Sequence, residues 1–342
     1  MKNLNIIMNE RIYEDKYYFY SENIDCKSII EGLDKKFELK LFARRTKVKK
    51  NNKLLFSNII LSNNIYNFLL NIFFSLKFKK NSVYLIISIT PYTFFSYLLL
   101  FFFTKDIFLY LRSDGFKEYA AILGNKWTFL YSFMFYIITK KVKIISCTPA
   151  ITKGKPFHLV QPSEIDNDWL KNRSFKKKNK IKILYIGRLK IEKGIFNLID
   201  LLKNIDDNKI SLSIVGETTD LMKNLTKRIN FLDYVSEKSD LINLYDTHDI
   251  LILPSYTEAH PKVLDEALSR YRPVIIFDEI KHVINGRIGV FCSKRDADKL
   301  KETIYFIIEN FQKIFNDLKK NKLPTKKSFL DNLARIINNN NN

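Results

Sequence analysis

The chain has 342 residues, 46% of them hydrophobic, and a formal net charge of +21. This length accommodates two domains of ordinary size, and the apolar content supports a packed core, which excludes wholesale disorder. The charge indicates an anionic partner such as nucleic acid, a phosphorylated substrate or acidic lipid. Because an AT-rich genome would also encode this abundance of Lys, Asn, Ile, Phe and Tyr, the charge alone does not select a function.

The three cysteines, Cys26, Cys147 and Cys292, are scattered and form no CxxC pair. An odd number of thiols cannot all be paired, so we expect a reduced, cytoplasmic compartment. The N-terminus shows no basic-then-apolar signal segment, which favours the same expectation.

In the first half of the chain, apolar runs rich in β-branched and aromatic residues predict strands at LNIIM, FELKLFA, VYLIISI, DIFLYL and VKIISC. The uncharged stretch 83–104 is long enough to cross a bilayer. It divides, however, into a strand and a helix, for which Thr90 is a suitable N-cap and Pro91 a suitable first residue. Because DIFLYL follows as a further strand, we favour a βαβ unit over a membrane span.

After Lys180 the alternation repeats, with strands predicted at IKILYIG, ISLSIVG, FLDYVS, DILILP and PVIIF. Helices are predicted between them, including Ile195–Asn204, 221–228 and one that begins at Pro261. Short apolar strands alternating with helices indicate a parallel sheet covered on both faces. The sequence therefore predicts an α/β fold of two doubly wound, Rossmann-like domains that face each other across a cleft.

Residues that follow the strands are the first candidates for function, because open parallel sheets bind ligands beyond the carboxyl ends of their strands. IKILYI is followed by GRLKIEKG, in which Gly187 permits a turn and a close approach of ligand to backbone. Arg188 and Lys193 precede a predicted helix, and cations beside a helix N-terminus suit an anion. Two surface cations without a ligand are an equally good interpretation. Gly216 ends the next strand, and neither GxxxxGK[ST] nor GxGxxG is present.

The stretch SYTEAHPKVLDEALSRYRPVI places Glu258 in a loop after a strand and Glu266 in the second turn of the helix that begins at Pro261. Both carboxylates can face the crevice, next to helix-start amides that are available to a diphosphate. This combination predicts a pocket for a sugar nucleotide, with two solvated surface acids as the alternative. His260 is either a donor contact or a helix-start residue, and His248 is expected to be structural.

GRLKIEKG, SIVGE, LYDTHDILILPSYTEAHPKVLDEALSRYRPVI and INGRIGVFC, in this order, resemble the donor-binding half of the GT-B retaining glycosyltransferases of group 1, or GT4. The resemblance covers roughly 181–292, and the E-x7-E element of the family is Glu258 and Glu266. The charge run NRSFKKKNK has no apolar periodicity and predicts a linker, either a solvated connection or an anion-binding hinge. Together with the resemblance it predicts four parts of the chain: an acceptor-binding domain over 1–170, a linker over 171–180, a nucleotide-sugar-binding domain over 181–325, and a C-terminal helix with a disordered Asn-rich tail over 326–342.

The resemblance implies retaining transfer of a sugar from a nucleotide-diphosphate sugar to a glycan or lipid-linked acceptor, in the synthesis of cell-surface polysaccharide, lipopolysaccharide or glycolipid. Glu258 would contact the sugar hydroxyls and Glu266 the ribose, while Arg188 and Lys193 would neutralise the departing diphosphate. No metal and no other cofactor are expected. The other residues expected at the donor are Gly187, Gly216, His260, Pro261, Lys262 and Val263.

The first half of the chain departs from the pattern of the family. LNIIMNERIYED has no glycine where relatives carry a glycine-rich loop, and Ser163 and Glu164 differ from the usual inter-domain turn. FLYLRSDG lies where relatives often place a His or Asp near the donor sugar, which makes Asp114 a catalytic candidate and Arg112 an acceptor-side candidate. Tyr271 stands where relatives often have the glycine that closes a helix.

The basic stretch RRTKVKKNNK and the apolar segment 65–80, which is closed by lysines, predict peripheral binding to the anionic inner face of the plasma membrane. The basic residues expected there are Arg44, Arg45, Lys47, Lys49 and Lys50. A buried helix with solvated lysines is the alternative for 65–80. Two other functions stay open: a nucleotide-sugar epimerase or non-catalytic relative of the same fold, and a basic nucleic-acid-binding protein. For the latter the basic stretch lacks aromatic residues, so no nucleic-acid partner is expected.

Overall fold

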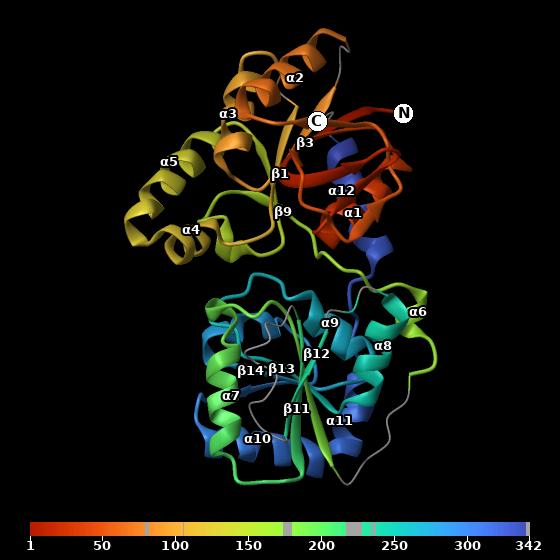
Figure 1. Ribbon diagram of the computed structural model, residues 1–342, viewed down its shortest axis with the longest axis vertical. Coiled ribbons are helices and arrows are strands. Elements are labelled where there is room, and N and C mark those ends of the chain that lie inside the picture. Colours follow the sequence, from red (N-terminus) through yellow and green to blue (C-terminus); the bar gives the residue numbers. More distant parts are fainter. Residues whose placement is uncertain are drawn as a thin grey trace. The chain divides into compact units, whose positions relative to one another are not determined.

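The computed structural model describes residues 1–78, 82–104, 106–173, 180–216, 228–233, 235 and 237–339. The chain divides into two compact units, Met1–Pro162 with Lys327–Asn342 (unit 1) and Ser163–Lys326 (unit 2). Each unit combines helices with a mainly parallel sheet, so the predicted α/β fold with two doubly wound sheets is confirmed (Figure 1). The first unit ends at Pro162, eight residues before the boundary that the sequence suggested, and most of the expected linker lies outside the described residues.

Unit 1 is built on the sheet β4-β2-β1-β6-β7-β8-β9, in which β1 also pairs with β3, and β3 with β5. Its central strands are parallel, and the five strands predicted in this half of the chain are β1, β3, β6, β7 and β8. Their apolar side chains form one buried core. The strands are β1 (Asn3–Asp15), β2 (Tyr18–Ser21), β3 (Glu38–Thr46), β4 (Asn52–Leu54), β5 (Ile59–Ser62), β6 (Val83–Ile87), β7 (Ile107–Leu111), β8 (Lys143–Ser146) and β9 (Phe157–Leu159).

The stretch 83–104 forms the predicted βαβ unit from β6 through α3 to β7. Thr90 caps α3 in a capping box with Thr93, and Pro91 is the first helical residue, as the sequence indicated. Within the described ranges, no helix combines the length and apolarity needed to span a membrane. The helices of unit 1 are α1 (Ile24–Asp34), α2 (Ile65–Phe78), α3 (Pro91–Phe101), α4 (Gly115–Leu123), η1 (Asn125–Trp127), α5 (Thr128–Ile138), η2 (Pro149–Ile151) and α12 (Lys326–Asn338).

Helix α12, the last element of the chain, packs into the core of unit 1. Phe329 lies 6.4 Å from Tyr110 between ring centroids, and Leu333 is fully buried. A Cβ added at Gly32 of α1 would lie 2.3 Å from Leu330, so the absence of a side chain there lets the two helices approach. The helix expected near the C-terminus is thus present, and it completes the first unit.

Unit 2 contains an all-parallel sheet in the order β12-β11-β10-β13-β14-β15. Strands β11 and β12 are added in turn on one side of β10, and the next strand along the chain, β13, pairs with the other side of β10. The neighbours β10 and β13 therefore form the topological switch point, where open α/β sheets bind ligands beyond the strand ends. The strands are β10 (Ile181–Ile186), β11 (Ile210–Val215), β12 (Ile229–Leu232), β13 (Ile250–Leu253), β14 (Val274–Phe277) and β15 (Val290–Ser293).

Helices of unit 2 cover its sheet and place their apolar side chains in a second core (Figure 1). The helix predicted over 221–228 falls almost entirely outside the described residues. Tyr271, just past α9, has φ +57°, the left-handed conformation that favours glycine. The helices are α6 (Asn167–Leu170), η3 (Ile191–Lys193), α7 (Ile195–Asn204), α8 (Lys238–Thr247), α9 (Lys262–Ser269), η5 (Asp278–Ile284), α10 (Ala297–Glu309) and α11 (Phe311–Leu318).

Candidate functional site

The carboxyl ends of β10 and β11 lie so close together that a side chain at Gly216 would clash with the backbone of Gly187. Gly187 donates its backbone N–H to the carbonyl of Val215 (3.1 Å). A Cβ on Gly216 would lie 2.5 Å from the Gly187 carbonyl oxygen, and a Cβ on Gly187 would lie 2.9 Å from the Tyr185 hydroxyl. The two glycines that the sequence singled out therefore meet at one point of the sheet edge.

The loop from Gly187 to Gly194 crosses from β10 to α7 and packs on the end of β13. The hydroxyl of Tyr185 donates to the carbonyl of Arg188 (2.8 Å), which fixes the turn and leaves the Arg188 side chain exposed. Gly194 has φ +66°, and a Cβ there would lie 1.9 Å from the carbonyl oxygen of Pro254. Glycine is needed at 194 for two reasons, its backbone conformation and the contact with β13.

Gly194→Ala is expected to destabilise the protein by about 2 kcal/mol or more, because strain at a left-handed residue adds to a backbone clash that Cβ cannot avoid. Urea unfolding followed by circular dichroism measures the change. Gly286→Ala is the matched control, since Gly286 has φ +76° and a Cβ added there would meet no atom within 4 Å. Its cost should be near 1 kcal/mol, that of the backbone alone. Equal losses in the two variants would contradict the tight contact at Pro254.

Lys193 and Glu258, which the sequence placed on different loops, form an ion pair in the structure. Lys193 Nζ lies 2.6 Å from Glu258 Oε1, and the side chains are only 21% and 14% exposed. Ser255 Oγ donates to the same carboxylate oxygen (2.7 Å), and His282 Nε2 lies 2.8 Å from the Glu258 carbonyl oxygen. The pair joins the loops that follow β10 and β13, at the switch point of the sheet.

Arg295, which the sequence analysis missed, braces this pair of loops. Its guanidinium donates to the carbonyl of Pro254 (2.6 Å) and that of Ser255 (3.3 Å), just before Glu258. It also donates to Asn197 of α7 (3.2 Å) and Glu279 of η5 (2.6 Å). The side chain thus connects these segments through the five fixed donors of arginine. Arg295 follows the strand β15, and that position was the available sequence signal.

Glu266, the second acid of the E-x7-E element, projects from α9 toward α8. It is 6% exposed, and the Tyr245 hydroxyl donates to its Oε2 (2.8 Å). Burial raises the pKa of Tyr245 well above its usual value, and the Glu266 charge raises it further, so the phenol stays protonated and donates. Tyr245 also lies 3.5 Å from the carbonyl of Val263. These contacts fix the orientation of the Glu266 carboxylate.

His260 lies in a buried charged cluster at the start of α9. Its Nε2 is 3.2 Å from Asp265 Oδ2, and Arg287 holds the same carboxylate in a bidentate contact (2.5 and 3.0 Å). Burial by itself would raise the pKa of Asp265, but hydrogen bonds from His260 and Arg287 outweigh it and lower the pKa. His260 is therefore directed at the protein. Pro261 is the N-cap, and Lys262 lies 3.3 Å from Glu164.

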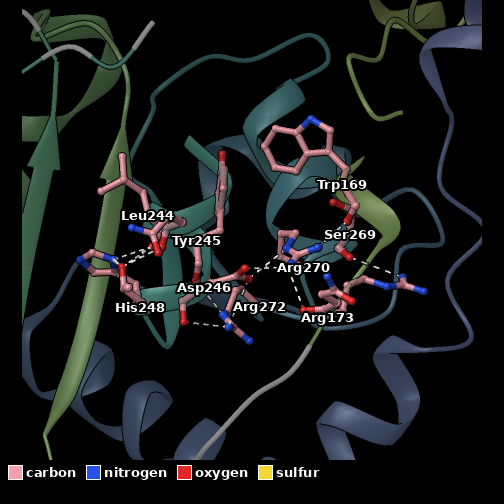
Figure 2. Close-up of polar contacts among 12 residues, drawn as sticks. Trp169, Arg173, Leu244, Tyr245, Asp246, His248, Ser269, Arg270 and Arg272 are labelled. Atoms are coloured by element: carbon pink, nitrogen blue, oxygen red, sulfur yellow. Dashed lines mark hydrogen bonds and ion pairs between the residues drawn. The ribbon is translucent and has the colours of Figure 1, made fainter. Parts of the chain in front are cut away.

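Below α9, two buried arginines share one carboxylate (Figure 2). Arg270 donates to both oxygens of Asp246 (2.9 and 2.6 Å) and to the carbonyls of Trp169 (2.8 Å) and Lys171 (2.7 Å). Arg272 donates to the Asp246 carbonyl (3.0 Å), and burial lowers its pKa to about 10. This network ties α6, α8 and the end of α9 together and so supports the helix that carries Glu266.

His248 has a structural environment, as the sequence indicated. Its Nδ1 lies 2.7 Å from the carbonyl of Leu244, and its Nε2 lies 2.8 Å from the hydroxyl of Ser213 (Figure 2). The ring thereby joins the end of α8 to β11 within the buried body of unit 2.

The comparison with protein families decides what this site belongs to. Residues 166–323 match the family model described as glycosyl transferases group 1. This part of the chain belongs to the group 1 glycosyl transferases. The match includes the Lys193–Glu258 pair, Glu266 and Arg295.

Curated relatives of the chain include a protein in a cps region and a capsular polysaccharide biosynthesis glycosyltransferase. The chain is 25% identical to an uncharacterized 41.2 kDa protein in the cps region of Klebsiella pneumoniae, over 78% of this chain and 74% of that protein. It is 28% identical to the capsular polysaccharide biosynthesis glycosyltransferase CapM of Staphylococcus aureus, over 45% of this chain and 42% of that protein. The chain thus spans less than half the length of CapM.

Comparison with solved structures shows that the chain has the two-domain GT-B fold. WaaG, a glycosyltransferase involved in lipopolysaccharide biosynthesis, has a TM-score of 0.68 at 14% identity, over 98% of this chain and 100% of that chain. Anabaena Alr3699/HepE in complex with UDP and glucose has a TM-score of 0.67 at 13% identity, over 99% and 100% of the two chains. At these identities the likeness concerns the fold.

In unit 1, the two sequence candidates have different environments. Asp114 caps α4, because its Oδ1 accepts the N–H groups of Phe116 (3.1 Å) and Lys117 (3.3 Å). Arg112 Nη1 lies 3.9 Å from Asp25 Oδ2. The cap gives Asp114 a structural role, while its catalytic role stays a prediction.

Sequence reasoning missed Glu10, a carboxylate of β1 near Arg112. Burial raises the pKa of Glu10, while the hydrogen bond from Ser21 (3.1 Å) and the charge of Arg112 partly oppose that rise. The glycine-free stretch after LNIIM therefore carries a half-buried acid close to the predicted acceptor-side arginine.

Proposed function

We propose that this group 1 glycosyl transferase moves a sugar from a nucleotide-diphosphate sugar to a glycan or lipid-linked acceptor, with retention of the anomeric configuration. The observation that carries the proposal is the Lys193–Glu258 ion pair, held by Ser255 at the switch point of the unit 2 sheet. A cation and a carboxylate side by side suit a donor in which a diphosphate adjoins a hydroxylated ring.

The predicted donor residues would have different roles, the cations toward the diphosphate and the carboxylates toward hydroxyl groups. Arg188 is exposed and Lys193 is half-buried, and both stand on the loop that leads into α7, so they would neutralise the departing diphosphate. Glu258 would accept hydrogen bonds from the sugar hydroxyls, and Glu266, oriented by Tyr245, from the ribose. In this mechanism the incoming phosphate displaces Glu258 as the ion-pair partner of Lys193. The Glu258 carboxylate then becomes available to the sugar hydroxyls.

The names of relatives support a role in cell-surface glycan synthesis. The similar proteins include one in a cps region, CapM and a putative teichuronic acid biosynthesis glycosyltransferase, TuaC, of Bacillus subtilis. A further relative from Campylobacter jejuni, 26% identical over 103 residues, is named for a diphospho-undecaprenol-linked acceptor. A lipid-linked acceptor is therefore the class to test first.

A thermal-shift panel of UDP-, GDP- and ADP-sugars tests donor binding. A ligand that binds only the folded state stabilises it by about 2.7 kcal/mol at a hundred times its Kd, so one nucleotide class should raise Tm. Glu266→Ala should reduce that shift. The selected donor is then incubated with a diphosphate-linked lipid acceptor, and NMR identifies the anomer of the product. Interconversion of the donor sugar without transfer would favour the epimerase, and no shift with any donor would contradict the proposal.

Transfer is expected to survive EDTA with less than about twofold loss of activity. Protein cations and the start of α7 would stabilise the negative charge of the diphosphate, a charge that a divalent ion stabilises in other phosphate chemistry. Initial rates with 5–10 mM EDTA, on the order of ordinary chelation conditions, are compared with rates in added Mg²⁺. Complete loss that Mg²⁺ restores would contradict the assignment of these residues.

Arg295→Met is expected to lower kcat about tenfold or more and to change the donor Kd less, because the loops that hold Lys193 and Glu258 would lose their brace. Arg295→Lys should recover only part of kcat, since an ammonium cannot reach the same set of segments. Steady-state kinetics and a binding titration with the selected donor separate the two effects. Lys294→Met is the matched control, being exposed and adjacent. A loss confined to donor Kd would make Arg295 a binding residue and contradict the positioning role.

A further inference from the structure

Helix α5 carries aromatic side chains on both its buried and its exposed face. Its sequence, TFLYSFMFYII, contains no charged residue. One face is buried in unit 1 through residues such as Tyr131 and Met134. On the opposite face Phe129 and Phe133 are 67% and 56% exposed, and Tyr136 is exposed as well. The spacing of four and three residues aligns these three rings in one stripe. A helix on a water-facing surface normally has polar residues there.

The stripe continues onto neighbouring elements. Trp127 of η1 stacks on Phe129 with 6.5 Å between ring centroids. Phe94 of α3 contacts both Phe133 (6.1 Å) and the exposed Phe95 (5.7 Å). Helix α5 lies beside α3 and α4 in unit 1 (Figure 1). We call the exposed rings of this region the aromatic surface: Phe95, Trp127, Phe129, Phe133 and Tyr136.

Lysines border the aromatic surface. Lys140 Nζ lies 4.1 Å above the ring of Tyr136, and Lys141 Nζ lies 4.6 Å above that of Phe101. Lys126 is exposed next to Trp127. Among the residues that the structure describes, none of these three ammonium groups is ion-paired with a carboxylate. The surface therefore combines exposed aromatic rings with positive charge that the protein itself does not neutralise.

We propose that the aromatic surface binds an anionic lipid bilayer. Trp and Tyr rings settle at the level of the lipid headgroups, Phe enters the acyl boundary, and lysines beside them contact phosphate groups. A contiguous apolar patch of this kind marks an interaction surface. A second copy of the chain would cover the rings but would bring the same lysines together, so the charge favours an anionic bilayer. The inference goes beyond the proposed transfer, because it requires no donor or acceptor.

The basic stretch after FELKLFA is less suited to this role than the sequence suggested. Arg44 lies 4.3 Å above an aromatic ring at the start of α3, Arg45 is 2.7 Å from a carboxylate of β1, and Lys50 is ion-paired with a carboxylate just after β2. The side chains of Lys47 and Lys49 are exposed. Three of the five expected cations thus already contact the protein.

Vesicle flotation with the full chain tests the proposal. Wild type should bind vesicles of phosphatidylglycerol and phosphatidylcholine, and bind far less to pure phosphatidylcholine. The double variant Phe129→Ser with Phe133→Ser should lower the vesicle partition coefficient at least about tenfold. Lys126→Gln, Lys140→Gln and Lys141→Gln together should do so on anionic vesicles only.

Two controls match these variants. Phe306→Ser removes an exposed phenylalanine of unit 2, and Lys47→Gln with Lys49→Gln removes exposed cations of the basic stretch. Both should bind vesicles like wild type. If the basic-stretch variant loses binding while the aromatic variant keeps it, the proposed surface is wrong. Far-UV circular dichroism and Tm verify that each variant is folded.

Tryptophan fluorescence gives a second, local readout. The chain has two tryptophans, and Trp127 is 49% exposed in the aromatic surface while Trp169 is 1% exposed in unit 2. Vesicles with brominated acyl chains should quench Trp127, and Trp127→Phe should abolish that quenching. Binding without quenching of Trp127 would overturn the proposal. So would a wild-type dimer in analytical ultracentrifugation that the aromatic variant converts to monomer without any vesicle binding.

Failure of this inference is distinguishable from failure of the proposed function. Binding of the donor selected by the thermal-shift panel is measured without lipid for the double variant Phe129→Ser with Phe133→Ser, and it should equal that of wild type. Loss of vesicle binding with intact donor binding supports separate surfaces. If the chain binds vesicles but no donor, the membrane-binding proposal is supported and the proposed sugar transfer is contradicted.

Discussion

Lys193→Ala is expected to lower kcat for sugar transfer by about 10²–10³-fold, with little change in Tm. Its ammonium is fixed 2.6 Å from Glu258 before any donor binds, so it would act on the leaving diphosphate as a preorganised charge. The loss of a half-buried ion pair should cost about 1–2 kcal/mol of stability, small beside the catalytic effect. Steady-state kinetics with the selected donor measure the change.

Glu258→Ala and the double variant show whether the pair acts as a unit. Glu258→Ala should also reduce kcat strongly, and the double variant should lose much less than the product of the single losses. Lys190→Ala is the control, since Lys190 is an exposed cation of the same loop. If Lys190→Ala and Lys193→Ala lower kcat equally, the effect would come from the overall positive charge of the loop and not from the ion pair. Wild-type turnover in the double variant would remove both residues from the site.

Arg270→Ala is expected to destabilise unit 2 by about 3–5 kcal/mol. The guanidinium is 2% exposed and ties a carboxylate and three backbone carbonyls together, so its removal leaves several buried acceptors without a donor (Figure 2). Urea unfolding followed by tryptophan fluorescence is a direct measurement, because Trp169 is the single tryptophan of unit 2 and its own carbonyl accepts from Arg270.

Arg173→Ala is the matched control for Arg270. Arg173 also contacts the end of α9, through the Ser269 carbonyl (3.5 Å) and the ring of Tyr271 (4.3 Å), but it is only part-buried. Its loss should cost about 1 kcal/mol or less. A similar small cost for Arg270→Ala would mean that water replaces the guanidinium easily and that the network does not support α9.

Local sequence determined the order and type of most elements. The uncharged stretch 83–104 resolves into strand, capped helix and strand because Thr90 and Pro91 act on neighbouring backbone groups. The glycines at 187 and 216 and the acids at 258 and 266 were identifiable because each follows a recognisable strand or lies in a recognisable helix. Fold class and the donor-side candidates follow from such short-range patterns.

The tertiary structure alone decided which of these residues meet. Lys193 contacts Glu258, 65 positions later in the chain, only because the chain reverses its strand order and places β13 beside β10. The contacts of Arg295 and Arg270 could not be predicted from local patterns, because their partners are distant in sequence. The exposure of the rings of α5 likewise depends on what packs against the helix, because periodicity cannot distinguish a buried ring from an exposed one when aromatic residues occur on opposite faces.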